Sequence, residues 1–531
     1  MVKGENRQGD LISVKKTTAM GLAGFLSLVF SASLLGLSLS AQAGSGSRDP
    51  HVTRADFAAS YLRFEEALSD MTLDPGEAAR VNREFDALTL LFFQKNYSRA
   101  VRKLHELTVS LGTGASAAEA GTAAASLAVR MMPPVFVLGA ESPALRVESL
   151  YDWTSDTGKI DLAVEIRKRR MHQDETAAVR VPFRADFRAG GTVDIELPFA
   201  LDPSRLGPGM YDLGIVYEKE FIRTGSWTVV KKDLDAVRDG NNRRIAALRL
   251  DPEKPDLADA LASVEARNNL LSQSPSPENT AQAVLDLSAL AAAVDAEIEV
   301  LGRGENPYRG RQGDTWRVIS DGQRRVPMRL YAPESFRPDT PLPLVVAFHG
   351  AGGDENMFME GYGAGLIRRL AETHGVLVAS PFTNAFAGPG APALFDRMLE
   401  ILSAEYPLDS GRIYLLGHSM GAGVVNRLCA ERPDKIAAAA CLCGFQGFGD
   451  AVAAIPPVLV IAAELDPLAF PGRIEPIAAR ATERGLPVTY RMIPGYGHTL
   501  VVARELPAVF EWLMAKVTSV RGGGFAGRAS G

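Results

Sequence analysis

Apolar residues recur at helical spacing from Pro50 to about Gly112. The turn signal Asp74-Pro75-Gly76 separates two apolar stripes, so the sequence predicts a helical hairpin. A stretch rich in Ala, Gly, Ser and Thr follows at 112–125 and is typical of a linker or a weak helix. We place this helical region at 44–132.

The hydrophobic period changes to two between 133 and 232. Alternating apolar and polar residues predict five short strands, at 162–166, 179–183, 193–197, 213–217 and 226–230. Turn formers such as Gly190-Gly191 and Pro208-Gly209 separate them. The pattern favours a small β-sandwich-like domain. The helical period returns at 233–302 and is broken by a Ser- and Pro-rich segment at 272–277.

Strands and helices alternate from 303 to 520, which is typical of an α/β domain. The strands at 316–319 and 328–331 are predicted to open the domain as an antiparallel pair. Six further strands are predicted, and their apolar runs are continuous, as in parallel strands that are buried on both faces. They lie at 344–348, 376–379, 413–416, 437–442, 458–462 and 488–492. The glycine-rich tail, 521–531, is predicted to be disordered.

Composition and net charge indicate a globular protein without a general affinity for polyanions. A chain of 531 residues with 46% hydrophobic and 23% charged residues is expected to form several globular domains. The net charge of −6 provides no general attraction to nucleic acid or to anionic membranes.

The first 43 residues have the pattern of an export signal. Lys15 and Lys16 precede an apolar stretch from Met20 to Leu39, and Ala41-Gln42-Ala43 fits a cleavage box. We therefore expect a periplasmic or secreted protein without a stable membrane anchor after cleavage. An uncleaved anchor is the alternative, because the stretch approaches the length of a membrane span.

Three cysteines, Cys429, Cys441 and Cys443, lie in the C-terminal third. We expect buried free thiols, although Cys429 could pair with one of the other two. The chain contains neither a metal-ligand spacing nor a Cys-His nucleophile pattern, and no metal or cofactor is expected.

The main candidate for chemistry is Gly417-His418-Ser419-Met420-Gly421, between an apolar strand and a helical pattern. Such a turn holds its central residue in a strained conformation, and Gly417 and Gly421 leave room for the close crossing of strand and helix. Ser419 is therefore a candidate nucleophile that needs a base. A turn serine without catalytic function is the alternative.

His498 and Asp466 are the candidate partners of Ser419. His498 lies in a glycine-flanked loop after the last predicted strand, and Asp466 comes just after the preceding one. The imidazole can act as general base, and the carboxylate can fix its tautomer and stabilise the imidazolium. Glu464 is the reserve acid, and Asp466 could instead cap the turn before Pro467.

These motifs resemble those of α/β-hydrolases, over about 40% of the chain. The chain order Ser419, Asp466, His498 is that of this fold, and His349-Gly350-Ala351-Gly352-Gly353 follows the third predicted strand. Within the fold, the chain is similar to secreted esterases of the feruloyl-esterase and polyhydroxyalkanoate-depolymerase type.

The resemblance implies an oxyanion hole formed by the backbone N–H groups of Met420 and Ala351. We interpret His349 and His418 as structural residues rather than extra bases or ligands. Because 444–457 is short, the site is expected to have no cap from within its own domain, and an open site suits bulky or polymeric substrates.

The fold class predicted overall is multidomain: helical segments and a small β-sandwich-like domain, followed by a C-terminal α/β-hydrolase domain. The predicted function is that of an exported serine hydrolase that cleaves carboxylic esters through an acyl-enzyme. A serine peptidase of the same fold, or a non-catalytic scaffold with a relic hydrolase domain, is the alternative. Small or polymeric esters are the expected substrates.

Overall fold

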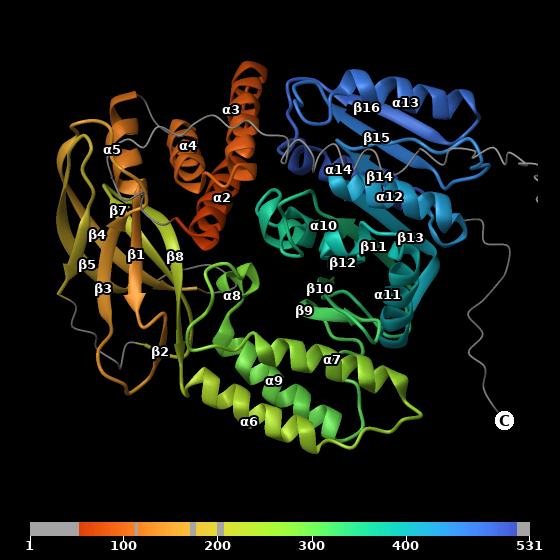
Figure 1. Ribbon diagram of the computed structural model, residues 1–531, viewed down its shortest axis with the longest axis horizontal. Helices are drawn as coiled ribbons and strands as arrows, with labels where there is room; N and C mark the ends of the chain where they lie inside the picture. The colour runs from red at the N-terminus through yellow and green to blue at the C-terminus, as the bar shows by residue number, and fades with distance from the viewer. Residues whose placement is uncertain (1–51, 112–114, 170–176, 199–205, 518–531) are drawn as a thin grey trace, which may run out of the picture. The chain divides into compact units, whose positions relative to one another are not determined.

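The computed structural model describes residues 52–111, 115–169, 177–198 and 206–517, all within one compact unit that begins at Asp49 (Figure 1). The predicted export signal at 1–43 and the predicted tail at 521–531 lie outside the described residues. Among the residues described, no helix combines the length and the hydropathy that a membrane-spanning segment needs.

Three helices, not a hairpin, form the first part of the described chain. They are α2 (Arg54–Ser69), α3 (Pro75–Phe93) and α4 (Tyr97–Ser110). The second apolar stripe is interrupted because Lys95 adopts a left-handed backbone with φ 58°, and Asn96 then caps α4. Helix α5 (Ala115–Ala125) occupies most of the stretch expected to be a linker or weak helix.

The described residues of the β-sandwich-like domain form eight strands in two sheets. The strands are β1 (Leu127–Met132), β2 (Val135–Val137), β3 (Ala144–Ser149), β4 (Gly158–Lys168), β5 (Ala177–Phe187), β6 (Asp194–Leu197), β7 (Gly209–Tyr217) and β8 (Glu220–Val230). One sheet has the order β1-β3-β6 and the other β2-β8-β7-β4-β5. Phe136, Tyr211 and Trp227 are buried in their shared core.

The first three strands were absent from the sequence prediction, and β1 lies inside the range assigned to helix. The first two are nearly continuous apolar runs without an alternation, and Pro133-Pro134 separates them. Pairing specifies them instead: β1 runs antiparallel to β3, with Leu127 opposite Ser149 and Met132 opposite Ala144. This is a tertiary effect that local propensity does not contain.

Four helices connect the sandwich to the C-terminal domain. They are α6 (Leu234–Ala247), α7 (Pro255–Asn269), α8 (Thr280–Val284) and α9 (Leu287–Gly302). Their apolar faces form one core with Tyr308 and with Trp316 and Val318, which lie in the first strand of the next domain.

The C-terminal domain alternates strands and helices throughout. Its strands are β9 (Gly313–Ser320), β10 (Arg325–Ala332), β11 (Leu342–Phe348), β12 (Leu377–Pro381), β13 (Leu408–His418), β14 (Ala438–Leu442), β15 (Val458–Ala463) and β16 (Val488–Ile493). Its longer helices are α10 (Leu366–His374), α11 (Ala391–Glu405), α12 (Met420–Glu431), α13 (Pro471–Glu483) and α14 (Val501–Met514). Short helical turns are η2 (Met357–Gly361), η3 (Thr383–Phe386) and η4 (Pro433–Lys435).

These strands form one sheet in the order β16-β15-β14-β13-β11-β12-β10-β9. The pairs of β10 with β9 and with β12 are antiparallel, and all other pairs are parallel. Apolar side chains of α11, α12 and α13 cover one face, and those of α10 and α14 cover the other. The predicted α/β-hydrolase architecture is confirmed.

Parallel strands place their carboxyl ends on one edge of the sheet, where sites of open α/β sheets form. The loop 349–353 follows β11, the turn at Ser419 follows β13, Asp466 follows β15, and His498 follows β16. Four segments that are distant in sequence therefore meet at one edge.

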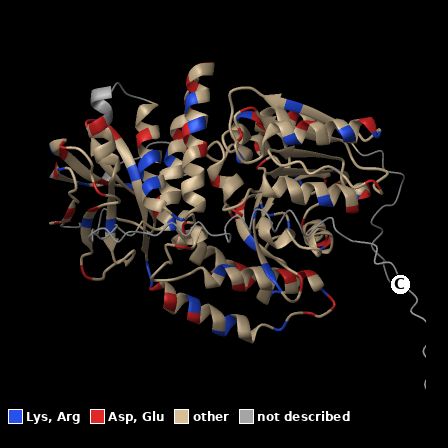
Figure 2. Ribbon diagram, turned by 45° about the horizontal axis from the view of Figure 1, so that its top comes forward, with Lys and Arg blue, Asp and Glu red and all other residues tan. Residues whose placement is uncertain are grey.

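Charged residues of both signs are mixed along the helices and strands, as Figure 2 shows. On α3, for example, Arg80 pairs with Glu77 and Glu84. Such surface pairs contribute little stability individually.

The ion pair between Arg317 of β9 and Glu405 of α11 is different, because both side chains are almost wholly buried. Removing one partner leaves a buried charge unpaired, so we expect Glu405→Leu to lower the free energy of unfolding by about 3–5 kcal/mol. Asp161→Asn, in the exposed Asp161–Arg184 pair, should leave the free energy of unfolding almost unchanged. Chemical denaturation of both variants measures the difference, and equal losses would contradict this assignment.

Candidate active site

Ser419 occupies the sharp turn between β13 and α12. Its backbone has φ 52° and ψ −113°, a strained conformation for a residue with a side chain. A Cβ on Gly417 would overlap the backbone of Gly421, and one on Gly421 would overlap the carbonyl oxygen of Phe348. The glycines on both sides of Ser419 therefore allow β13, α12 and β11 to approach closely, and the turn projects the serine at the sheet edge.

The structure brings Ser419, His498 and Asp466 together in one hydrogen-bonded chain. The Ser419 hydroxyl lies 3.0 Å from Nε2 of His498, and Nδ1 of His498 lies 2.8 Å from Oδ2 of Asp466. Because the ionised carboxylate only accepts, Nδ1 carries the proton and Nε2 is free to accept from the serine. This is the tautomer that a general base for Ser419 requires.

Asp466 is buried and held from two sides. Its Oδ1 accepts from the N–H groups of Leu468 and Ala469, both at 2.8 Å. Burial works to raise the pKa of Asp466, but the hydrogen bond and charge of His498 and these N–H groups outweigh it, and the pKa is lowered. Glu464, the reserve acid, is exposed and accepts from the N–H of Gly495 instead.

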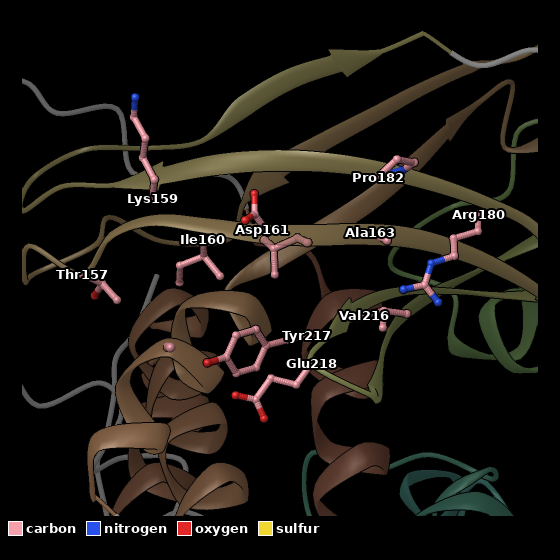
Figure 3. Close-up of a pocket in the computed structure, with 12 residues that line it drawn as sticks. Thr157, Lys159, Ile160, Asp161, Ala163, Arg180, Pro182, Val216, Tyr217 and Glu218 are labelled. Carbon is pink, nitrogen blue, oxygen red and sulfur yellow. The ribbon is translucent and has the colours of Figure 1, made fainter.

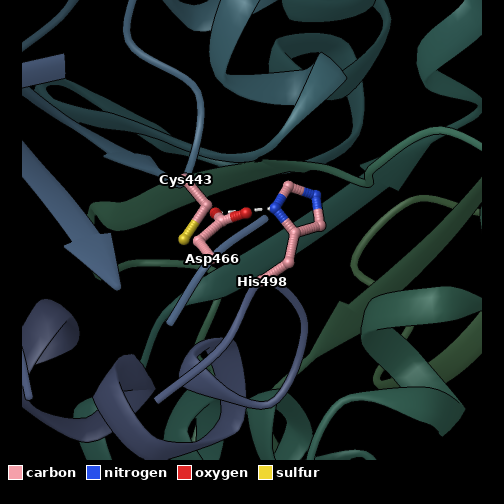
Figure 4. A group of neighbouring side chains, drawn as sticks. All are labelled: Cys443, Asp466 and His498. Atoms are coloured by element: carbon pink, nitrogen blue, oxygen red, sulfur yellow. Dashed lines mark hydrogen bonds and ion pairs between the residues drawn. The ribbon is translucent and has the colours of Figure 1, made fainter. Parts of the chain in front are cut away.

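Cys443 lies directly against this pair, as Figure 4 shows. Its thiol is in hydrogen-bond contact with Asp466, and burial holds the pKa of the thiol well above its usual range. The sulfur, a carboxylate oxygen and a ring nitrogen of His498 lie within 4.8 Å of one another, which is close enough for a metal ion. The carboxylate and the imidazole already bond to each other, however, so we interpret the group as an acid–base pair with a neutral thiol neighbour. Cys429 and Cys441 are also buried free thiols, as predicted.

His418 and His349 both serve as neutral structural residues. The carbonyl of His498 accepts from Nε2 of His418 at 2.9 Å, so Nδ1 of His418 accepts from the Tyr362 hydroxyl at 2.7 Å. Burial lowers the pKa of His418 to about 3 and that of His349 to about 4. In His349, Nδ1 donates to the carbonyl of Gly350, and Nε2 accepts from the N–H of Thr383.

The candidate oxyanion hole lies between β11 and the turn at Ser419. A Cβ on Gly350 would lie 3.4 Å from the Cβ of Ser419, so the loop that carries Ala351 passes beside the serine. Met420 begins α12, where backbone N–H groups have no partner within the helix. Within the described chain, neither the Ala351 nor the Met420 N–H donates to a protein acceptor.

The N-terminal helices reach this site, which the sequence analysis missed. The N–H of Gly497 donates to Oδ1 of Asn82 at 2.8 Å, and the N–H of His498 donates to both carboxylate oxygens of Asp86, at 3.0 and 3.2 Å. Asn82 and Asp86 lie one turn apart beside the apolar stripe of α3. Two polar residues at that spacing are the signal that the sequence offered, and their burial is known only from the structure.

The same helices also contact the loop after β11. Arg54 donates to the carbonyl of Gly352 at 3.1 Å, and a Cβ on Gly352 would lie 2.5 Å from the ring of Phe92 and 3.4 Å from that of Phe93. The segment 444–457 contains no helix or strand, so the hydrolase domain provides no cap of its own there. Contacts from α2 and α3 replace the fully open site that the sequence suggested.

A hollow of about 600 Å³ lies elsewhere, on the five-stranded sheet of the sandwich (Figure 3). Tyr217 and Glu218 line it together with Asp161 and Arg180, and it shares no residue with the triad. Asp161 and Arg180 are already paired, with Arg184 and Glu165. We therefore assign the chemistry to the sheet edge and not to this hollow.

Comparison with known proteins agrees with the architecture. Residues 343–455 match a family model described as the alpha/beta hydrolase fold. No curated protein matches the chain significantly. Solved structures that are similar include an S-formylglutathione hydrolase from Staphylococcus aureus (19% identity, 39% of this chain and 98% of that one, TM-score 0.32). Another is a hyperthermophilic esterase from Pyrobaculum calidifontis (20% identity, 39% and 85%, TM-score 0.31). These low identities carry no information on substrate.

The glycine at 421 provides a direct test of the turn geometry. We expect Gly421→Ala to abolish labelling of Ser419 by a fluorophosphonate, because the new Cβ would overlap the carbonyl of Phe348. Gly423→Ala is the matched control on the same helix, since its Cβ would meet only the side chain of Gln446, at 3.2 Å. Labelling rates and thermal unfolding are measured for both. Normal labelling of a Gly421→Ala protein would contradict the close approach described here.

Proposed function

We propose that the α/β-hydrolase domain of this chain is a serine esterase that acts through an acyl-enzyme. The observation that carries the proposal is the continuous hydrogen-bonded chain from Asp466 through His498 to the strained Ser419. A serine hydroxyl is too weakly acidic to attack an ester unless a base takes its proton, and here a correctly oriented base is in contact with it.

The first half of the proposed reaction forms a bond between Ser419 Oγ and the ester carbonyl carbon. Nε2 of His498 takes the serine proton, and Asp466 stabilises the resulting imidazolium. The negative charge that develops on the carbonyl oxygen is met by the N–H groups of Met420 and Ala351. His498 then gives its proton to the leaving alcohol, and the carbon–oxygen bond to that alcohol breaks.

In the second half of the proposed reaction, water attacks the acyl-enzyme and Ser419 is the leaving group. His498 takes a proton from water as its oxygen attacks the acyl-enzyme, and the proton passes to Ser419 Oγ as the acid is released. No redox step occurs, and the residues present account for every proton transferred. The neutral Tyr362–His418 pair fixes the backbone carbonyl of His498 and thereby the position of the base.

Exposed apolar side chains near the site support an apolar acyl or alcohol group in the substrate. Phe93 lies beside the loop of the candidate oxyanion hole and is 47% exposed, and Leu90 precedes it by one turn. Leu468 and Phe470 are also exposed, just after Asp466. Apolar residues exposed together around a site are typical of ligand-binding surfaces. The apolar sequence from Met20 to Leu39 supports export of the enzyme.

Replacement of the nucleophile tests the reaction. We expect Ser419→Ala to lower kcat for aryl esters by about 10⁶-fold, as for removal of other triad serines, while thermal unfolding stays within a few degrees. Mass spectrometry should locate a fluorophosphonate label on Ser419 of the wild type and none on the variant. Wild-type turnover in Ser419→Ala would end the assignment, and turnover of peptide anilides but not of esters would favour a peptidase.

Phe93 tests the substrate class. If its ring contacts an apolar acyl chain, Phe93→Ser should lower kcat/KM for a long-chain ester about fivefold more than for an acetyl ester. Met71→Ser is the control. Met71 is also an exposed apolar residue, but it precedes the first residue of α3, whereas Phe93 is the last residue of that helix. An equal effect of Phe93→Ser on all chain lengths would contradict the proposed contact.

A further inference from the structure

Two buried polar residues of α3 contact the loop that carries His498. Asn82 and Asp86 are 2% and 4% exposed and lie one helical turn apart, so they face the same direction. Their acceptors meet successive backbone donors: Gly497 donates to Asn82, and His498 donates to Asp86. The N–H of Thr499 also contacts the Asp86 carboxylate.

The donors belong to the segment that leads into α14. Helices begin with N–H groups that lack partners within the helix, and buried donors must be satisfied elsewhere. Leu500 of the same segment packs into the apolar core formed by α2, α3 and α4, so water does not replace these partners. The loop of His498 is therefore held by residues outside the hydrolase domain.

Capping alone does not require a charge at position 86. Asn82 satisfies the neighbouring N–H with a neutral amide oxygen, whereas Asp86 places a carboxylate in the interface. Within the described chain no Lys or Arg pairs with Asp86, and burying an unpaired carboxylate is costly. The ionisable groups that face it are His498, Asp466 and Cys443. His498 is the one that can become a cation.

We infer that Asp86 is a positioning residue for His498, and that its negative charge stabilises the imidazolium formed during acyl transfer. The inference rests on the proposed esterase reaction. Asp86 fixes the backbone of His498, while Asp466 fixes the ring, so the base is held at both ends. The charge of Asp86 acts when His498 holds the serine proton, which is the moment at which positive charge develops.

A specific pH dependence follows from this assignment. Burial raises the pKa of Asp86 to about 6, partly offset by the N–H of His498 and by the charge of His498. Asp86 is therefore ionised well above pH 6 and neutral below it. Its electrostatic contribution to the reaction is therefore fully present at pH 8 and largely lost at pH 5.5.

Asp86→Asn separates charge from geometry, because the amide oxygen can still accept from the N–H of His498. We expect kcat for an aryl ester to fall about three- to tenfold at pH 8 with KM unchanged. At pH 5.5 the ratio of wild-type to variant kcat should be clearly smaller than at pH 8, since most of the Asp86 carboxyl groups are then protonated. If the role of Asp86 were purely structural, Asp86→Asn would lower kcat by the same factor at both pH values.

Asp86→Leu removes both the charge and the acceptor. Misplacement of the base should lower kcat about 10²-fold at pH 8, and amide hydrogen exchange at His498 should become faster. Glu84→Gln is the matched control, because Glu84 is an exposed carboxylate on the same helix that pairs with Arg80. It should leave kcat and exchange unchanged.

The outcomes separate this inference from the proposed function. A wild type that does not turn over esters would remove the esterase proposal, while exchange at His498 would still report the contact with Asp86. If the wild type is active and the ratio of wild-type to Asp86→Asn kcat is the same at pH 5.5 and 8, the electrostatic role is wrong. If a folded Asp86→Leu protein keeps wild-type kcat and exchange, the positioning role is wrong as well.

Discussion

Buried backbone donors on the loop of His498 are the constraint that joins the parts of this protein. The loop is covered on one side by the hydrolase sheet and on the other by α3, so its N–H groups cannot bond to bulk water. Asn82 and Asp86 meet this requirement from outside the domain. The N-terminal helices are therefore attached to the loop that carries the proposed general base, and the position of that loop depends on their docking.

An acidic side chain of the N-terminal helices also accepts from a backbone donor of the hydrolase domain elsewhere in this interface. Glu65 of α2 accepts from the N–H of Gly363 and from the hydroxyl of Tyr61, and burial raises its pKa to about 7. A carboxyl group with a raised pKa in the folded state favours folding when it is protonated. The contribution of Glu65 to the free energy of unfolding therefore falls as the pH rises from the usual carboxyl range toward 7. Glu405, in contrast, is a buried carboxylate that is paired with a cation, Arg317.

Local sequence patterns were sufficient to predict elements that residues close in sequence specify. The strand–turn–helix around Ser419 and the continuous apolar runs predicted the sheet, because buried parallel strands and a glycine-flanked elbow each leave a recognisable pattern. They were insufficient for β1 to β3, which pairing specifies, and for the break at Lys95, which divides one apolar stripe into two helices. Asp86 could not be assigned to the site, because its contact with His498 depends on how two distant segments pack.

The contact between Asp86 and His498 joins residues 412 positions apart in sequence. Contacts of such long range are made late and slow the folding of a chain, because a large loop must close before they form. During synthesis α3 leaves the ribosome long before the loop of His498 exists, and until then Asn82 and Asp86 lack their partners. The position of the His498 loop is therefore complete only after the C-terminal segment has been made and has packed against α3.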